Sequence, residues 1–182
     1  MCEIEVKLKV KNLQELEKKL VARGCILSTP IHQHDTVYSK NGNVSIWEGL
    51  KEECIVLRIR RDGKGALFTL KQQRTHELDN VEYETCVDNP EALHSALLLL
   101  GFTPGVEVRK VRRKGKLDND EICLDEVEGL GGFIELERLA DDDANPENVA
   151  EDLYQKLESL GLSRRDEEKR GYDTQIFQLR KN

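Results

Sequence analysis

The sequence lacks any apolar run of the ~20 residues that a membrane-spanning helix needs. It also lacks a linker rich in Pro, Gly or Ser, since only four prolines and 13 glycines occur in 182 residues. The first residues enter a charged, strand-like stretch, so we expect no secretory signal peptide and no membrane partner. These absences predict a single domain over residues 1–182, large enough to bury its own core.

Paired cysteines and the common catalytic motifs are absent as well. The five cysteines form no CxxC pair, which argues against a disulfide framework and favours a cytoplasmic protein. No GxxxxGK[ST] loop occurs, and the four histidines lack metalloprotease spacing. The net charge of -7 argues against general nucleic-acid binding, because counterion release requires a basic surface. The basic cluster KVRRKGK at 110–116 is the local exception, and a solvated hairpin is its simplest interpretation.

Helices and strands can be predicted from caps and periodicity. Helices with an apolar stripe and a terminal glycine are expected at 12–23, 90–100 and 146–160, and a short fourth helix at 172–179. Alternation of apolar and charged residues predicts strands at 1–10, 53–61, 66–73, 80–87, 121–127 and 133–139, and a further one at 32–39. Residues 106–114 do not alternate cleanly, so the pattern does not assign their faces. Glu-x-Glu at the head of three strands that lead into helices suggests a duplicated strand–helix unit, although chance is an alternative.

The charged faces of these strands raise the functional question. One charged face usually meets solvent, but five strands repeat the plan, and exposed ion pairs contribute only about 0–1 kcal/mol each. Eight or so strands closed into a barrel leave an interior that can hold one small ligand. We therefore expect an α+β fold, an antiparallel eight-stranded barrel with charged side chains inside and amphipathic helices outside. Three helices cannot cover eight strands, so a homodimer is expected too.

The mixture of charges points to a ligand that carries phosphates and divalent metal. Buried ions without partners cost several kcal/mol each, whereas a polyanion with Mg²⁺ or Mn²⁺ would balance both signs. Carboxylates at i and i+2 on a strand point the same way and suit these ions. Arginine forks and lysine point charges suit phosphate oxygens. The acidic pairs are Glu3/Glu5 and Glu135/Glu137, and the bases are Lys7, Arg58, Arg60, Lys71 and Lys110.

An ordered set of motifs resembles the CYTH superfamily, the triphosphate tunnel metalloenzymes. EIEVK at 3–7 is similar to the ExExK signature of that superfamily. It is followed by QHDTVY at 33–38, LRIR at 57–60, TLK at 69–71, VEYE at 81–84, KVR at 110–112 and LDEVEGLGGFIELE at 124–137. The last stretch and the QHDT element resemble the class IV adenylyl cyclase branch more than the thiamine triphosphatase branch. One departure is Gly171, which stands where the family often has a serine.

The resemblance implies a role for each matching residue. The metal-site positions match Glu3, Glu5, Glu135 and Glu137. The substrate-binding positions match Lys7, Lys9, Arg58, Arg60, Lys71, Glu82, Glu84, Lys110 and Arg112. The candidate catalytic residues are Glu5, Lys110, Arg112 and Asp125, and Asp125 is expected near the reacting end as an aid to proton removal.

The resemblance favours an adenylyl cyclase, and the hydrolases of the same superfamily are the alternative, because both would hold the triphosphate in the same way. An adenylyl cyclase would convert ATP to cyclic AMP and pyrophosphate, whereas a thiamine triphosphatase or inorganic triphosphatase would direct water at a terminal phosphate. A non-catalytic module that binds nucleotide or polyphosphate is a further alternative. The stretch 40–50, with the lone Trp47, is expected to be either a mobile mouth that stacks a base or a thiazole, or a loop with one packed aromatic.

Overall fold

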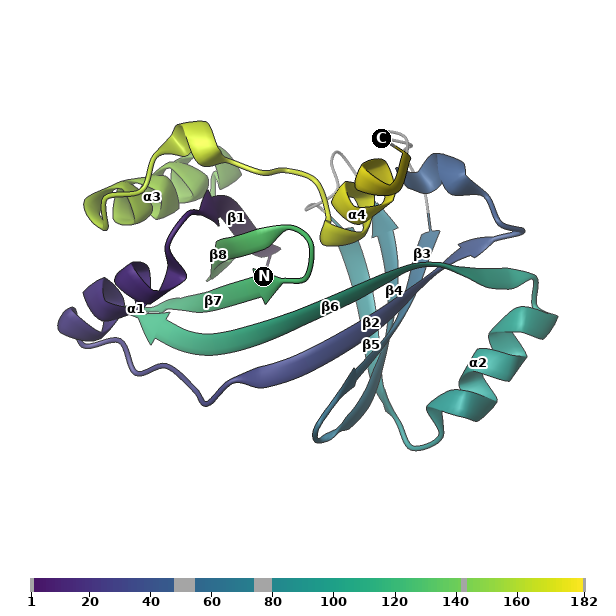
Figure 1. Cartoon of the computed structure of the whole chain (residues 1–182). Helices are drawn as coiled ribbons and strands as arrows, with labels where there is room; N and C mark the ends of the chain where they lie inside the picture. The colour runs from purple at the N-terminus through teal and green to yellow at the C-terminus, as the bar shows by residue number, and fades with distance from the viewer. Residues whose placement is uncertain (1, 48–54, 74–79, 142–143, 182) are drawn as a thin grey trace. The chain divides into compact units, whose positions relative to one another are not determined.

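A computed structural model describes residues 2–47, 55–73, 80–141 and 144–181, apart from a few side chains at the ends of these segments. It contains eight strands and four α-helices (Figure 1). The strands are β1 (Cys2–Val10), β2 (Ile31–Lys40), β3 (Ile55–Asp62), β4 (Gly65–Gln73), β5 (Asn80–Val87), β6 (Phe102–Leu117), β7 (Asp120–Val127) and β8 (Gly131–Ala140). The helices are α1 (Leu13–Ala22), α2 (Pro90–Leu99), α3 (Pro146–Ser159) and α4 (Tyr172–Lys181), and a 3₁₀ turn, η1, spans Val44–Trp47.

The chain divides into two compact units. The first comprises residues 1–30 and 111–169, and the second comprises residues 31–110 and 170–182. Strand order is β1-β8-β7-β6 in the first and β6-β2-β3-β4-β5 in the second, because the long strand β6 begins in one unit and ends in the other. The eight predicted antiparallel strands and the helices are thus confirmed. Closure into a tunnel and a single domain stay predictions, since the end strands β1 and β5 belong to different units.

The predicted helix boundaries are confirmed by their caps. The side chains of Asn12, Asn89 and Asn145 each accept a hydrogen bond from a backbone N–H in the first helical turn. Gly24, Gly101 and Gly161 follow the C-caps of α1, α2 and α3, with φ of 84°, 83° and 86°. A left-handed backbone conformation at this place is natural for glycine and ends a helix.

The apolar face of the first unit's strands is covered by helices. Val6 and Leu8 of β1 are buried with Leu136 of β8, and α1 and α3 supply Leu20 and Leu157 to the same core. Side chains alternate between the faces of a strand, so Glu5 and Lys7 of β1 and Glu135 and Glu137 of β8 lie on the face opposite this core. The predicted division into a helix-covered apolar face and a charged face is therefore observed in this unit.

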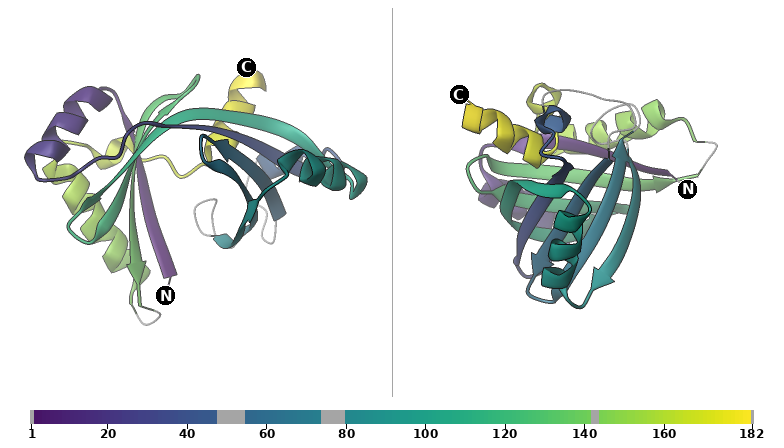
Figure 2. Two further views of the ribbon diagram at one scale, coloured as in Figure 1. Left: turned by 90° about the horizontal axis from the view of Figure 1, so that it is seen from below. Right: turned by 90° about the vertical axis from the view of Figure 1, so that its right-hand side faces the viewer.

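The second unit leaves part of its apolar surface exposed. Leu97 of α2 packs against Tyr38, Leu57 and Ile59, and Figure 2 shows α2 lying along the strands of this unit. Tyr83 of β5 nevertheless remains 66% exposed. The exposed apolar side chains of this unit also include Ile55, Leu98, Leu99 and Leu100.

Candidate functional site

The acidic residues of the first unit gather on one face of β1, β8 and β7. In the register, Glu5 lies opposite Glu137, Lys7 opposite Glu135, and Cys123 opposite Glu135 on the other side of β8. Residues paired across strands, and residues two apart along a strand, share a face. This arrangement brings together four of the residues selected from the sequence. The backbone of Glu3 pairs with Leu139, but its side chain lies outside the described residues.

Arg112 is held at this face by two carboxylates. Its Nε and Nη2 donate to the two oxygens of Asp125 at 2.7 and 2.5 Å, and Nη2 also donates to Glu135. All three side chains are buried. Burial lowers the pKa of Arg112, but Glu135 and Asp125 raise it well above its ordinary value overall. Arg112 is therefore a fixed positive charge. Asp125 orients it here, and the role of Asp125 in proton removal stays a prediction.

Three potential metal ligands adjoin this ion-paired group. Cys123, Glu135 and Glu137 each offer one ligand atom, and these atoms lie within 4.8 Å of one another. Two carboxylates fit the oxygen preference of Mg²⁺ or Mn²⁺, and a nearby guanidinium suits the phosphate that such ions bridge. The donor set thus fits a divalent cation. Cys123 was missed from the sequence, because its relation to the acids depends on the register of two strands.

The two lysines of β1 have different surroundings. Lys7 is only 2% exposed, although its side chain lies on the charged face of β1. Lys9 is exposed, with its Nζ 5.8 Å from the centre of the Phe133 ring. The charged face of β1 is therefore not simply in contact with water at Lys7.

The second unit carries a basic group centred on Asp35 of β2. Arg60 Nε and Nη2 donate to the two Asp35 oxygens, both at 2.7 Å, and Arg58 Nη1 lies 3.9 Å from Oδ2. Burial raises the pKa of Asp35, but the hydrogen bonds and charge of Arg60, with the charges of Arg58 and Lys110, lower it to about 2. Asp35 therefore stays ionised and holds two like charges close together. The sequence placed Asp35 in a motif without assigning it this role.

The bases of β3 and β4 are also paired with acids of β5. Arg58 Nη2 lies 3.1 Å from Thr69 Oγ1 and 3.4 Å from Glu84 Oε1, and Thr69 donates to Glu84 at 2.8 Å. Lys71 forms an ion pair with Glu82. Glu82 and Glu84 thus form ion pairs with these bases and do not make a separate acidic site in this unit.

Lys110 contacts an aromatic ring from the C-terminal helix. Its Nζ lies 4.9 Å from the ring centre of Tyr172 in α4, and both side chains are largely buried. A cation over a tyrosine face is stabilised by the ring quadrupole. The C-terminal helix, which follows the departure from the family pattern at Gly171, therefore positions one of the candidate substrate-binding residues.

Trp47 is a packed aromatic and not an exposed stacking platform. It is 1% exposed, its Nε1 donates to Asp173 Oδ2 at 2.9 Å, and its ring lies 5.2 Å from that of Phe177. Of the two interpretations of this loop, the structure favours the packed one. Residues 48–50 of the same stretch lie outside the described residues.

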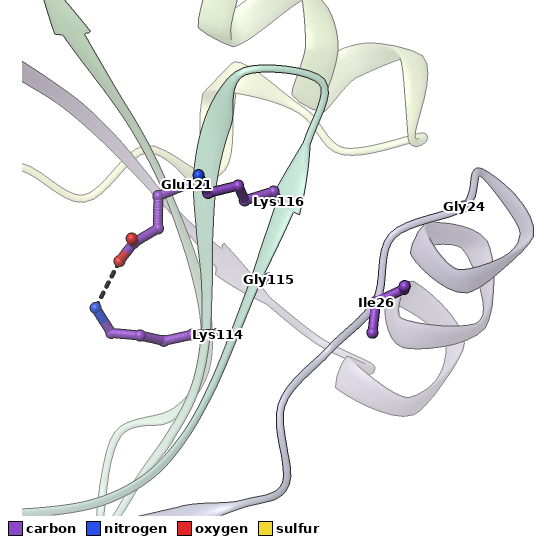
Figure 3. Close-up of a pocket in the computed structure, with 6 residues that line it drawn as sticks. All are labelled: Gly24, Ile26, Lys114, Gly115, Lys116 and Glu121. Carbon is purple, nitrogen blue, oxygen red and sulfur yellow. Dashed lines mark hydrogen bonds and ion pairs between the residues drawn. The ribbon is translucent and has the colours of Figure 1, made fainter.

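A surface cavity of the first unit lies beside β6 and contains none of the selected residues. It is lined by Gly24, Ile26, Lys114, Gly115, Lys116 and Glu121 (Figure 3). Lys114 and Glu121 form an ion pair at 2.5 Å across it, as the dashed line shows. Their charges are thus satisfied by each other, and we assign this cavity no role.

The structure is an antiparallel β-fold that carries paired acids and ion-paired bases on its strands. Such a combination suits the binding of a metal ion together with phosphate. Residues 1–172 match the CYTH domain family, and the chain belongs to this family. The resemblance inferred from the motifs is therefore confirmed.

Several proteins of known sequence or structure resemble the chain. The Methanocaldococcus jannaschii protein named "Putative adenylate cyclase MJ0240" is 28% identical over 166 residues, which are 90% of this chain and 92% of that protein. The structure of PH1819 from Pyrococcus horikoshii is 26% identical, with a TM-score of 0.79 and 99% of each chain covered. The Hippeastrum protein HpAC1, described as having a dominant triphosphatase activity, is 21% identical over 97% of this chain and 95% of its own, with a TM-score of 0.65. This last likeness concerns the fold alone.

Within the described segments, no helix combines the length and apolar character needed to cross a membrane.

Proposed function

We propose that the chain is a metal-dependent enzyme that acts on a triphosphate, and that it is an adenylyl cyclase converting ATP to cyclic AMP and pyrophosphate. The observation that carries the proposal is the group formed by Arg112, Glu135 and Glu137. It sets a fixed, buried positive charge beside two potential metal ligands within one unit. Membership of the CYTH family and the name of the M. jannaschii relative support it.

In this proposal the acids of the first unit bind the divalent ion. These residues are Glu3, Glu5, Glu135 and Glu137. The ion would supply charge neutralisation for the phosphates and activate an oxygen nucleophile, so no protein nucleophile is required. Mg²⁺ and Mn²⁺ are both suitable by donor type, since each accepts carboxylate oxygens.

The bases of both units bind phosphate oxygens in this proposal. They are Lys7, Lys9, Arg58, Arg60, Lys71, Lys110 and Arg112. Charged donors held in place before the substrate arrives stabilise the charge that develops on a leaving pyrophosphate. Asp125 and Asp35 hold two of these arginines by both carboxylate oxygens, while Glu82 and Glu84 restrain Lys71 and Arg58 until phosphate replaces them.

A second candidate function is hydrolysis of a triphosphate to release orthophosphate. The observation in its favour is the burial of Trp47 against Phe177, which removes the one tryptophan proposed to stack on a base or a thiazole and so favours an inorganic triphosphate. The Hippeastrum neighbour with dominant triphosphatase activity is consistent with this alternative. A hydrolase would use the same metal and phosphate residues and would differ only in the nucleophile.

The experiment that decides between these functions is a substrate panel. The purified chain is incubated with ATP, thiamine triphosphate and tripolyphosphate, each with Mg²⁺ and with Mn²⁺, and the products are resolved. Cyclic AMP with pyrophosphate establishes the cyclase. Orthophosphate without cyclic AMP replaces it by a triphosphatase, and binding without turnover reduces the chain to a nucleotide- or polyphosphate-binding module.

A matched pair of variants ties any activity to this site. Glu137→Gln removes a proposed metal ligand and should abolish turnover. Glu126→Gln makes the same chemical change at an exposed position of β7, three residues along the strand from Cys123, and should leave turnover unchanged. Equal loss in both variants would contradict the assignment.

We also propose that the chain forms a homodimer through the second unit. The exposed apolar side chains Tyr83, Ile55 and Leu99 support this, because contact with a second chain would remove them from water. Leu99 is 90% exposed. Light scattering on the purified chain measures the mass directly, and a monomer at all concentrations would refute the dimer.

A further inference from the structure

Cys123 places a sulfur atom within the acidic face of the first unit. The side chain is fully buried and lies on β7 directly opposite Glu135. Its sulfur and one carboxylate oxygen from each of Glu135 and Glu137 lie within 4.8 Å of one another. The sequence-based metal site consists of carboxylates only. This chain therefore adds a donor of a different chemical type to that site.

The surroundings of Cys123 differ from those of Cys25, the other cysteine of this unit whose side chain the structure describes. A buried free cysteine usually behaves as a small apolar side chain. Cys25 fits that description, since it packs in the core formed by the helices and the apolar strand faces. Cys123 belongs to the opposite, charged face, where its sulfur donates to Glu121 Oε1 at 3.9 Å, lies beside Glu135 and Glu137, and is influenced by the charge of Arg112. Apolar packing therefore does not account for a sulfur at this position.

We propose that Cys123 is a ligand of the metal bound at Glu135 and Glu137, and that it makes this site select thiophilic divalent ions such as Zn²⁺ and Cd²⁺ over Mg²⁺. The inference rests on the proposed function only in placing a divalent ion at these two glutamates. Thiolate sulfur binds Zn²⁺ strongly, whereas Mg²⁺ takes oxygen ligands and retains water. The thiol proton passes to solvent as the ion binds, because the thiolate is the ligand.

The geometry allows such an ion with small side-chain movements. Bonds of about 2.3 Å to sulfur and about 2.1 Å to oxygen place the ligand atoms of a tetrahedral ion roughly 3.5 Å apart. The observed limit of 4.8 Å requires the three side chains to close by about an ångström. A carboxylate offers several acceptor positions, so Glu135 can accept from Arg112 and bind the ion at once. Three protein ligands leave a fourth position for water or a phosphate oxygen.

The selectivity has a functional consequence. An ion held by sulfur and both glutamates occupies the carboxylates that Mg²⁺ requires. Zn²⁺ or Cd²⁺ therefore competes with Mg²⁺ for this site, and the sulfur contact determines how strongly. Loss of an outer-sphere partner alone costs about 10–100-fold in metal affinity, so loss of the sulfur ligand should cost at least tenfold in Cd²⁺ affinity by the same scale.

The test is a Cd²⁺ titration of the metal-free full-length chain, followed by the ultraviolet charge-transfer absorption of a cadmium–thiolate bond and by calorimetry. The expected result is one Cd²⁺ per chain with this absorption in the wild type and in the control variant Cys86→Ser, which alters an exposed cysteine of the second unit. Cys123→Ser should lose the absorption and bind Cd²⁺ at least about tenfold more weakly. Persistence of the absorption in Cys123→Ser would overturn the proposal.

A second variant keeps the proposal testable if Cys123→Ser does not fold. Glu137→Gln retains the thiol and removes one carboxylate ligand, so it should weaken Cd²⁺ binding. Unchanged Cd²⁺ affinity in Glu137→Gln would contradict the three-residue site. Turnover of the triphosphate panel by the wild type is measured separately. A sulfur-bound Cd²⁺ without turnover would refute the enzyme and support Cys123, whereas turnover without sulfur-bound Cd²⁺ would do the reverse.

Discussion

Replacement of Asp35 by asparagine should destabilise the second unit in a pH-dependent way. The carboxylate is buried and accepts two hydrogen bonds from Arg60, with Arg58 beside it. Its pKa falls from 3.8 to about 2, and a pKa shift of one unit corresponds to about 1.4 kcal/mol. The ionised group therefore stabilises the folded state by about 2–3 kcal/mol at neutral pH. Asparagine cannot carry this charge, so Asp35→Asn should lose about that amount.

The sign of the pH dependence follows from the lowered pKa. A carboxyl whose pKa is lower in the folded state stabilises that state above the unfolded pKa, and this contribution is lost as the pH falls through the folded pKa. The difference in the free energy of unfolding between wild type and Asp35→Asn should therefore have its full value at pH 7. With a pKa of 3.8 unfolded and about 2 folded, roughly half of it should remain near pH 3.

Urea denaturation at a series of pH values measures this difference. Asp88→Asn is the matched control, because Asp88 is exposed in the same unit and should change the free energy of unfolding by less than about 0.5 kcal/mol. The reasoning is wrong if Asp35→Asn costs as little as the control at pH 7. It is equally wrong if the cost stays constant from pH 7 to pH 3.

Three further substitutions separate binding, turnover and packing. Glu5→Gln should nearly abolish metal-dependent turnover, and a rate within twofold of wild type in a product assay would contradict its proposed role as a metal ligand. Arg58→Ala should mainly raise KM for the triphosphate, by about 10-fold or more for a lost charged contact, and an effect on kcat alone would oppose that assignment. Gly105→Ala would place a Cβ 2.0 Å from Trp47 Cη2, whereas Gly63→Ala would meet nothing within 4 Å. Thermal unfolding should therefore show a loss of about 1–3 kcal/mol for the first variant and little for the second.

The strands and helices could be predicted because local signals determine them. Asn89-Pro90 and Gly101 set the ends of α2, and alternation set the faces of β1 and β8. Strand β6 resisted prediction for a physical reason. Its buried row continues from Val106 and Val108 to Lys110 and Arg112. The side chains of this row change from apolar to charged, although all four are buried. Only carboxylates and an aromatic ring from distant segments make those charged positions suitable for burial.

The candidate site could be predicted as a set of residues but not as a set of contacts. The spacing of Glu135 and Glu137 places both on one face, as strand geometry requires. The pairing of Asp35 with Arg60 depends on the register between β2 and β3, and the sequence does not contain that register. The same holds for Cys123 opposite Glu135. Both relations join residues that no local pattern connects.

The attachment of α4 to Trp47 gives the protein an optical reporter. Trp47 is the only tryptophan of the chain, and two of its contacts, Asp173 and Phe177, come from α4. The same helix carries Tyr172, which covers Lys110. Fluorescence from one indole thus reports whether the C-terminal helix is seated over Lys110. Emission would shift to longer wavelength when α4 detaches, without any introduced dye.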